Sequence, residues 1–344
     1  MHVLESETRM KNLLYKIRCF KSETIKNMFT IINNIHNKTK KNRLIMFFDM
    51  VFCSIRFGAG PYDYQEFEFY NLNNAERKTY LTRVGNNAIV RRFNKKEDFY
   101  KFDDKHELNR IFDKYLHRDW MYLEEDNYDE FVKFCADKED FFAKPEDGSG
   151  GFGIELIKVD PNTLKETYDR LLKMNVRLLE EKIIQNEQLA LLNKNSVNTL
   201  RIVTFFDGQE AHVINVVFKI GNGGITDNFS SGGMYTFIED GKIVVPAIDR
   251  DDNVFEVHPV SGIKLVGYEM PNYDSAIALV KECAKVVPTI QYVGWDVAIT
   301  PEGACLIEGN AYPGVFQIKP SFLDKKVGLV PRFEKAMGTK IKDL

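Results

Sequence analysis

Three side chains that carry oxygen ligands fall in two apolar segments late in the sequence. Asp296 lies within residues 293–299, and Glu308 and Asn310 end the segment 306–310. Alternate residues of a strand share one face, so Glu308 and Asn310 point the same way, and Asp296 on a paired strand can face them. Such oxygens suit Mg²⁺, which keeps its other positions for water and substrate phosphates. Solvated strand ends are the alternative, although carboxylates within apolar strands are costly without a cation.

A lysine followed by a glycine-rich turn forms a second candidate site. Residues 144–153 read Lys-Pro-Glu-Asp-Gly-Ser-Gly-Gly-Phe-Gly between two apolar segments. Glycine lets backbone N–H groups approach phosphate oxygens, and Lys144 on the preceding strand can add positive charge there. The segment lacks the Gly-Lys-Ser/Thr ending of a Walker A loop, and no helix opens directly after it as in a dinucleotide-binding fingerprint. Taken alone, this segment is weak evidence, and a plain flexible turn is the favoured interpretation.

Charged residues in further apolar segments suggest the remaining parts of a nucleotide site. Glu180 and Glu181 lie in the segment 178–184, whose backbone can meet an adenine edge while a carboxylate meets ribose hydroxyls. Taken alone, such a segment is more often the end of a surface strand. Arg201 and Lys219 also interrupt apolar segments, and buried cations need anionic partners. Phosphate is the favoured partner, and an internal salt bridge is the alternative.

The periodicity around these residues predicts an α+β chain with a mostly antiparallel sheet in its second half. The predicted helices are 105–116, 128–136, one beginning at Asp160-Pro161, and 275–287. The predicted strands are 141–144, 154–159, 177–184, 199–206, 211–220, 234–238, 242–247, 293–299 and 305–308. Asp207-Gly208 and Asp240-Gly241 are hairpin signals between strands. Residues 58–92 are expected to be irregular and rich in aromatic side chains.

The first 57 residues are basic, with eleven Lys or Arg against four acids. Their apolar residues recur at helical spacing, which predicts one or two amphipathic helices. A helix packed on its own domain with a solvated basic face is the favoured interpretation, and a membrane-surface or partner-binding element is the alternative.

Composition narrows the function classes. A net charge of −3 gives no support to nucleic-acid binding. Five scattered cysteines without a CxxC pair fit reduced thiols in the cytosol, and because residues 1–10 are polar and charged we expect no signal peptide. The longest apolar run, 44–55, is interrupted by Asp49 and is too short to span a bilayer. We therefore expect a soluble, cytoplasmic protein, and no HExxH pair or Ser-His-Asp arrangement suggests zinc or acyl-enzyme chemistry.

The order of a helix-borne lysine, a lysine-glycine loop, a hinge acid and an Asp…Glu-x-Asn set resembles the ATP-grasp superfamily. More narrowly, the chain resembles the sugar-transfer-associated ATP-grasp family, from near Gly60 to near Pro320. The motifs that carry this resemblance are Leu200-Arg201-Ile202, Asp227-Asn228-Phe229-Ser230-Ser231-Gly232-Gly233, His258-Pro259, Gly294-Trp295-Asp296 and Glu308-Gly309-Asn310. The resemblance implies an ATP-grasp fold, in which two α+β lobes hold ATP between them, preceded by a helical basic region. The expected domains are a helical or irregular region at 1–100, a lobe with the glycine-rich lid at 101–180, and a catalytic lobe with the antiparallel sheet and magnesium site at 181–344.

The resemblance also implies roles for individual residues. Lys105 and Lys144 would contact the ATP phosphates beneath a lid formed by Ser149, Gly150 and Gly151. The residues expected to line adenine and ribose are Glu180, Glu181, Lys182, Ile183 and Glu187. Asp296, Glu308 and Asn310 would hold two Mg²⁺ ions, and Arg201, with Lys219 on the next strand, would stabilise charge at the transferring phosphoryl group. The residues expected on the substrate side are Asp227, Asn228, Ser230, Gly232, Gly233 and His258.

The activity implied is that of an ATP-dependent carboxylate–amine ligase that forms an amide through an acyl phosphate. Its partners would be a small-molecule or sugar-linked carboxylate and an amine, in capsular or other surface-polysaccharide biosynthesis, with no nucleic acid. A peripheral membrane or glycosyltransferase contact through the N-terminal helices stays open. The alternatives are an ATP-grasp kinase that phosphorylates a hydroxyl, and a non-catalytic membrane-surface binding module. One departure from the family pattern leaves the substrate open, because no βαβ domain precedes Lys105, where many ATP-grasp ligases bind their acceptor.

Overall fold

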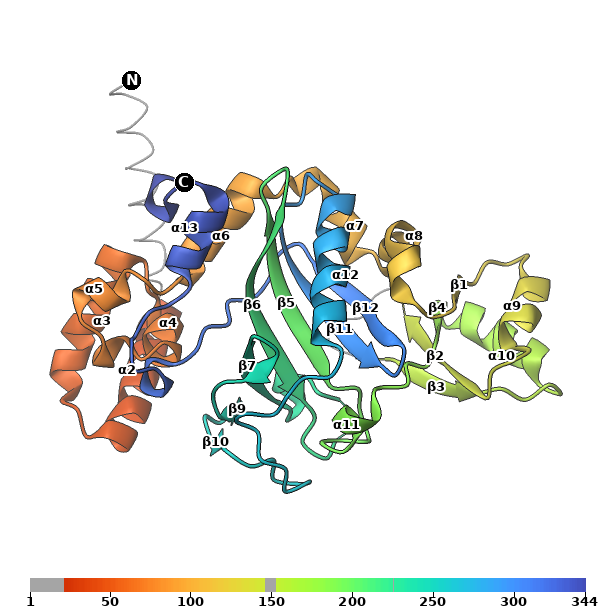
Figure 1. Ribbon diagram of the computed structural model, residues 1–344, viewed down its shortest axis with the longest axis horizontal. Helices are drawn as coiled ribbons and strands as arrows, with labels where there is room; N and C mark the ends of the chain where they lie inside the picture. Colours follow the sequence, from red (N-terminus) through yellow and green to blue (C-terminus); the bar gives the residue numbers. More distant parts are fainter. Residues whose placement is uncertain (1–21, 146–152, 225) are drawn as a thin grey trace. The chain divides into compact units, whose positions relative to one another are not determined.

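The computed structural model describes residues 22–145, 153–224 and 226–344 (Figure 1). The expected lid residues Ser149, Gly150 and Gly151 lie outside these ranges. The chain divides into two compact units, Met1–Arg92 together with Gly314–Leu344, and Phe93–Pro313. This division differs from the expected boundaries, because the C-terminal segment joins the first unit and not the unit that carries the antiparallel sheet.

The described part of the first unit is helical. Its elements are α2 (Ser22–Thr39), α3 (Arg43–Phe57), α4 (Pro61–Glu66), η1 (Phe69–Asn71), α5 (Asn74–Arg77), α6 (Arg83–Phe93, which crosses into the second unit), η4 (Pro320–Phe322), α13 (Val330–Met337) and η5 (Ile341–Asp343). The helices α2 and α3 confirm helix formation in the basic N-terminal region. The expectation of an irregular segment at 58–92 is wrong, because α4, η1, α5 and most of α6 occupy much of it. Helices of four to six residues are too short to show a 3.6-residue period, so only their caps, such as the Asn73 capping box, could have revealed them.

A buried ion pair and two amide contacts hold this unit together. Arg77 Nη2 lies 2.7 Å from Asp49 Oδ2, and the Tyr64 hydroxyl donates to the same carboxylate at 2.8 Å. In the C-terminal segment, the Gln317 side chain makes two hydrogen bonds of 2.9 Å with the backbone of Leu81, one as acceptor and one as donor. Residues far apart in sequence therefore share one core.

The first sheet of the second unit is antiparallel, and its described strands follow the order β1-β4-β2-β3. The strands are β1 (Trp120–Tyr122), β2 (Asp140–Pro145), β3 (Glu155–Lys158) and β4 (Val176–Glu181), packed with α9 (Tyr128–Cys135) and α10 (Leu164–Lys173). Helix α10 begins at Leu164 and not at Pro161, because the Asp160 carboxylate accepts a hydrogen bond from Asn162 N at 2.9 Å and its carbonyl accepts from Thr163 N at 3.0 Å. This Asx turn occupies the residues that were expected to start the helix.

The second sheet is also antiparallel, and within the described residues its order is β10-β9-β7-β6-β5-β11-β12, with β8 paired to β7. Its strands are β5 (Thr199–Phe206), β6 (Ala211–Ile220), β7 (Met234–Glu239), β8 (Lys242–Ile243), β9 (Ala247–Asp249), β10 (Val254–Phe255), β11 (Tyr292–Thr300) and β12 (Gly303–Asn310). The predicted single strand at 242–247 divides into β8 and β9, since Pro246 lacks the N–H that a continuous ladder needs. The remaining elements of this unit are η2 (Lys96–Asp98), α7 (Tyr100–Asp103), α8 (Lys105–Leu116), α11 (Glu187–Ala190), η3 (Phe229–Ser231) and α12 (Tyr273–Val286).

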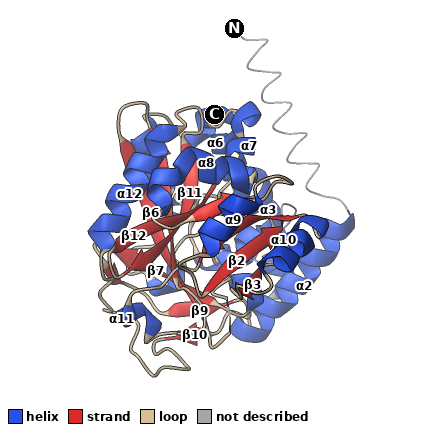
Figure 2. Ribbon diagram, turned by 90° about the vertical axis from the view of Figure 1, so that its right-hand side faces the viewer, coloured by secondary structure: helices blue, strands red, loops and turns tan. Residues whose placement is uncertain are grey.

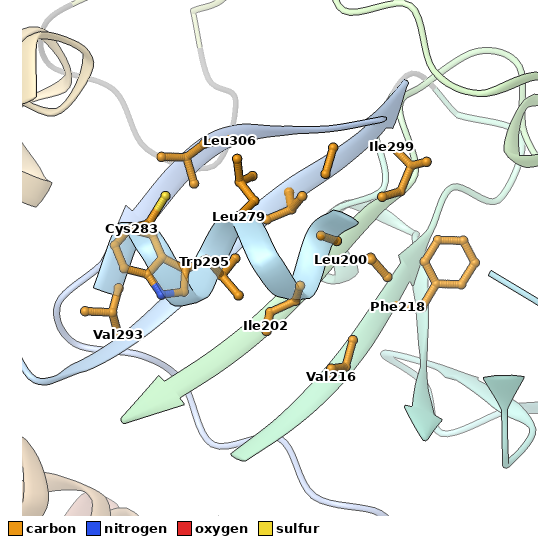
Figure 3. Close-up of a cluster of buried hydrophobic side chains, with 14 of the residues drawn as sticks. Leu200, Ile202, Val216, Phe218, Leu279, Cys283, Val293, Trp295, Ile299 and Leu306 are labelled. Carbon is orange, nitrogen blue, oxygen red and sulfur yellow. The ribbon is translucent and has the colours of Figure 1, made fainter. Parts of the chain in front are cut away.

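Helix α12 covers one face of the second sheet (Figures 1 and 2). Leu279 and Cys283 of α12 lie above Leu200, Ile202 and Trp295 in the close-up of this core (Figure 3). Because successive strand residues point to opposite faces, the alternation that buries these side chains sends their neighbours to the other face of the sheet. The core pattern therefore decides where the charged residues of β5, β6 and β11 point.

Among the described helices, none combines the length and the apolar character needed to cross a bilayer.

We expect Phe218→Ala to lower the free energy of unfolding of the second unit by about 3–5 kcal/mol, because the side chain is fully buried and its loss leaves a cavity. Both tryptophans, Trp120 and Trp295, belong to this unit, so denaturant titration followed by tryptophan fluorescence reports on it. Val254→Ala at the exposed edge strand is the control and should change stability little. Equal effects of the two variants would contradict this description of the core.

Candidate functional site

A buried carboxylate lies at the centre of the second sheet, on the face opposite α12. The strand register pairs Asp296 of β11 with Arg201 of β5 on one side and with Glu308 of β12 on the other. Arg201 donates to both Asp296 oxygens, from Nε at 2.5 Å and from Nη2 at 2.7 Å. Lys219 of β6 reaches across from the next strand, and its Nζ lies 2.9 Å from each Asp296 oxygen. The Asp296 side chain is 8% exposed.

These contacts explain how the carboxylate stays ionised in the sheet. Burial alone would raise the pKa of Asp296, but the adjacent Arg201 and Lys219 cations outweigh it and hold that pKa well below its usual range. Burial likewise opposes the charge on Arg201, but Asp296 raises its pKa above the ordinary value. Of the two partners considered for Arg201 and Lys219, the structure shows the internal salt bridge. Phosphate as a further partner of Arg201 and Lys219 stays a prediction.

The other two expected metal ligands lie beside Asp296 and are more open to solvent. The Asn310 amide donates to Glu308 Oε1 at 3.2 Å, and the Glu308 side chain is 52% exposed. Partial removal from water and the neighbouring Asp296 carboxylate raise the pKa of Glu308 above its usual value. One buried carboxylate, one accessible carboxylate and one amide form an oxygen-rich set that fits Mg²⁺ with open positions for other ligands. Across the described ranges, no group of three or more His, Cys, Asp and Glu side chains could hold a metal ion.

A second buried acid lies at the first sheet. Glu180 of β4 faces Lys144 of β2, whose ammonium donates to it, and Arg118 Nη2 lies 3.1 Å from Glu180 Oε1. The Asn109 amide of α8 donates to the same Oε1 at 2.9 Å. Burial opposes ionisation of Glu180, but Lys144 and Arg118 outweigh it and lower its pKa to about 2. Glu180 is thus ionised and almost fully covered by protein.

This cluster joins the two sheets of the second unit. Arg118 also donates from Nη1 to the Leu306 carbonyl of β12, the strand that carries Glu308 and Asn310. Lys105, at the start of α8, donates to the Pro145 carbonyl at 3.1 Å, so it lies at the end of β2 beside Lys144. The expected phosphate-contacting lysines therefore lie together at the last described residues before the glycine-rich segment.

Asn109 and Arg118 were missed in the sequence analysis. Asn109 follows Lys105 by one helical turn, so the predicted helix 105–116 already placed the two on one face. Arg118 follows the end of α8 with no pattern around it, and only the tertiary structure shows its partners.

The remaining residues expected around adenine and ribose lie on the chain after β4. Glu181 exchanges two hydrogen bonds with the Asp119 backbone, of 2.8 Å and 2.9 Å, which anchors the end of the strand. Lys182 pairs with Asp140 at 3.2 Å. Ile183 lies half-buried in the loop that follows, and Glu187 is exposed at the first residue of α11. The strand ends at Glu181 and not at residue 184, so the backbone after it is outside the ladder of the sheet.

The loop expected on the substrate side is anchored to β5. Asp227 Oδ2 accepts from the backbone N and the hydroxyl of Thr199, at 3.0 Å and 2.5 Å. The Asn228 carbonyl accepts from Gly233 N at 3.0 Å, and Gly232 has φ +96°. A Cβ on Gly233 would lie 2.2 Å from the Asp227 carbonyl oxygen, so only glycine fits there. Ser230 belongs to the short helix η3 between these anchor points.

His258 has a different environment from the rest of the expected substrate residues. Its ring is fully buried, and Nδ1 accepts from Ser261 N at 3.1 Å. Nε2 therefore carries the proton and donates to the Gly221 carbonyl at 2.9 Å. Direct contact with a substrate would require this ring to give up bonds that connect the loop after β10 to the end of β6.

Lys105, Lys144 and Glu180 thus lie at the first sheet of the second unit, and Arg201, Asp296 and Glu308 lie at the second sheet. The profile of the family described as sugar-transfer associated ATP-grasp matches residues 85–335. The chain belongs to this family. No curated protein matches the sequence.

Solved structures of ATP-grasp ligases resemble the fold at low sequence identity. The ligase PsnB, complexed with precursor peptide PsnA2 and AMPPNP, is 13% identical with a TM-score of 0.41, over 72% of this chain and 61% of that one. D-alanine–D-alanine ligase from Bacillus anthracis is 15% identical with a TM-score of 0.36, over 70% and 65%. The enzyme of the same name from Helicobacter pylori is 13% identical with a TM-score of 0.39, over 71% and 61%. The chain thus spans less than two thirds of the length of these structures.

We expect Glu180→Gln to lower the free energy of unfolding at neutral pH by about 3–5 kcal/mol, because it leaves Lys144 and Arg118 buried without their anion. A carboxylate whose pKa is depressed by folding stabilises the protein above its unfolded pKa, near 4.3, and ceases to do so as the pH falls to about 2.

The stability difference between wild type and Glu180→Gln should therefore narrow as the pH falls below about 4.3, as measured by denaturant titration at a series of pH values. Glu125→Gln removes a solvent-exposed carboxylate that pairs with Arg177 and is the control. A pH-independent difference would show that ionisation of Glu180 does not stabilise the fold.

Proposed function

We propose that this protein is an ATP-dependent carboxylate–amine ligase. It activates a carboxylate as an acyl phosphate and lets an amine displace the phosphate, which yields an amide. A sugar acid or sugar-linked carboxylate is the proposed acceptor, in the synthesis of capsular or other surface polysaccharide. The acceptor class rests on the family description, and the reaction class rests on the site.

The observation that carries the proposal is the charge arrangement around Asp296. Two carboxylates, Asp296 and Glu308, balance the two cations Arg201 and Lys219. A divalent metal added to this set would leave an excess of two positive charges, and the excess grows with a second metal ion. Phosphate oxygens are the ligands that would offset it, so the set favours metal and polyphosphate together over metal alone.

In this proposal, Asp296, Glu308 and Asn310 hold Mg²⁺, which neutralises charge on the phosphates and on the transferring phosphoryl group when bound. Arg201 and Lys219 lie within reach of the same oxygens and turn from Asp296 toward them. Lys105 and Lys144 bind the phosphates from the side of the first sheet, with Ser149, Gly150 and Gly151 proposed to close over them.

Glu180, Glu181, Lys182, Ile183 and Glu187 are the proposed residues around adenine and ribose. The loop 227–233, with Asp227, Asn228, Ser230, Gly232 and Gly233, is the proposed acceptor side. No side chain is required to form a covalent intermediate, since positioning and charge neutralisation supply most of the rate enhancement in phosphoryl transfer.

We expect calorimetry to detect binding of Mg-ATP but no comparable binding of Mg²⁺ alone, because the cations beside Asp296 repel a bare dication. Lys144→Ala and Glu308→Gln should each weaken Mg-ATP binding at least tenfold. Glu269→Gln, a solvent-exposed acid of the same unit, is the control. Tight Mg²⁺ binding without nucleotide would contradict the charge argument, and wild-type binding by both variants would remove these residues from the site.

The reaction class is tested by incubating the protein with ATP labelled at its γ-phosphate, candidate uronates or sugar-linked acids, and hydroxylamine as the amine. The fate of the label is then followed. A ligase releases the label as inorganic phosphate together with a hydroxamate, and Glu308→Gln should lower that rate at least 100-fold. Label retained on a hydroxyl of the acceptor would instead identify a kinase. Neither product from any acid or alcohol, in protein that binds Mg-ATP, would leave a binding module as the better description.

A further inference from the structure

We propose that helix α3 docks the protein on an anionic membrane surface through an exposed apolar face. The α3 face consists of Leu44, Ile45, Phe48, Phe52 and Ile55, whose exposed fractions are 66%, 69%, 63%, 43% and 56%. This proposal is independent of the reaction proposed above, because every residue that carries it lies outside the ATP-grasp site.

The α3 face is a continuous stripe. Its residues recur at intervals of three and four, so they lie one above another along the same side of the helix. Met46, Met50 and Cys53 occupy the opposite side and are buried in the core of the first unit. The helix is therefore apolar on both sides, of which one is buried in the core of the first unit and the other is exposed to solvent. Along the axis the stripe is about 16 Å long.

Aromatic side chains extend the stripe onto the preceding helix. Phe47 stacks on Phe29 of α2 with ring centroids 5.7 Å apart, and Phe48 packs edge-on against Phe47 at 5.6 Å. Phe29 is itself 54% exposed. The half-buried Phe47 ring thus holds the two exposed rings Phe29 and Phe48 in place. Exposed aromatic rings that are already ordered can enter the headgroup boundary of a bilayer with little further ordering.

The charges around the α3 face favour anionic lipid over a protein partner. Residues 26–57 contain six Lys or Arg, namely Lys26, Lys38, Lys40, Lys41, Arg43 and Arg56, and Asp49 as their one acid. Asp49 is paired with Arg77, so its negative charge contributes little to the electrostatic potential around the α3 face. Basic residues concentrate at the N-terminal end of α3 and in the turn before it, and Arg56 follows the stripe at its other end. Cations around an apolar stripe are typical of helices that lie in the interface of an anionic bilayer.

The geometry also limits how deep the contact goes. Helix α3 has 15 residues, so its length of about 22 Å is shorter than the roughly 30 Å hydrocarbon core. It is held in the first unit by its buried side, so it would lie along the surface and would not insert across it. The protein would thus be recruited to the membrane surface without a spanning segment.

The test is co-sedimentation of the full-length protein with vesicles of phosphatidylcholine alone and with 30% phosphatidylglycerol. We expect binding to the anionic vesicles that weakens as salt is raised. Phe48→Ser/Phe52→Ser should reduce the bound fraction at least tenfold, and Lys40→Gln/Lys41→Gln should reduce it selectively on anionic vesicles. Leu191→Ser/Val260→Ser removes two comparably exposed apolar side chains from the second unit and is the matched control. Circular dichroism and thermal melting establish that each variant is folded.

Three outcomes would overturn the proposal. The first is wild-type protein that stays in solution with anionic vesicles. The second is a Phe48→Ser/Phe52→Ser variant that binds vesicles as well as the wild type does. The third is analytical ultracentrifugation showing a wild-type dimer that the same variant abolishes, without vesicle binding, which would assign the α3 face to a second copy of the chain.

Discussion

The placement of one carboxylate inside a sheet constrains most of the second unit. An isolated ionised Asp in this position would be strongly unfavourable, so Asp296 depends on cations from two other strands. Arg201 and Lys219 reach it only because β6, β5 and β11 are neighbours in a fixed register. A slip of one residue in any of these strands would move its charged side chain into the core under α12. The charge cluster and the apolar core thus both follow from the alternation of side chains between the two faces of the sheet.

Glu180 repeats this arrangement in the other sheet. It too is an almost fully covered acid held by two cations, and its partners come from β2 and from the segment after α8. Because Arg118 also bonds to the backbone of β12, the cluster fixes the edge of one sheet against the strand that carries Glu308. Each acid thus holds a pair of cations in a fixed orientation.

How much could be predicted from sequence varied with the physical origin of each feature. Strands β5 and β6 begin and end at the expected residues, since each is a mostly apolar run of eight or ten residues bounded by turn residues. The short helices between residues 58 and 92 and the break at Pro246 were not predicted, because single caps and single prolines decide them. The family was recognised and is confirmed by the match over residues 85–335. The partner of Arg201 could not be settled, since a sequence contains the cation and the carboxylate without the distance between them.

The first unit is assembled from both ends of the sequence, with Gln317 bonded to Leu81 and Ser321 to Glu68. Residues 93–313 are thus inserted into the sequence of the first unit. They are also synthesised before its last segment. During synthesis the second unit is complete before the last segment of the first unit exists, so the ATP-grasp lobes can fold while the helical unit still lacks part of its core. A chain interrupted near residue 313 would contain the whole second unit but would leave the helical unit unfinished. Proteases would then cleave the helices of the unfinished first unit first.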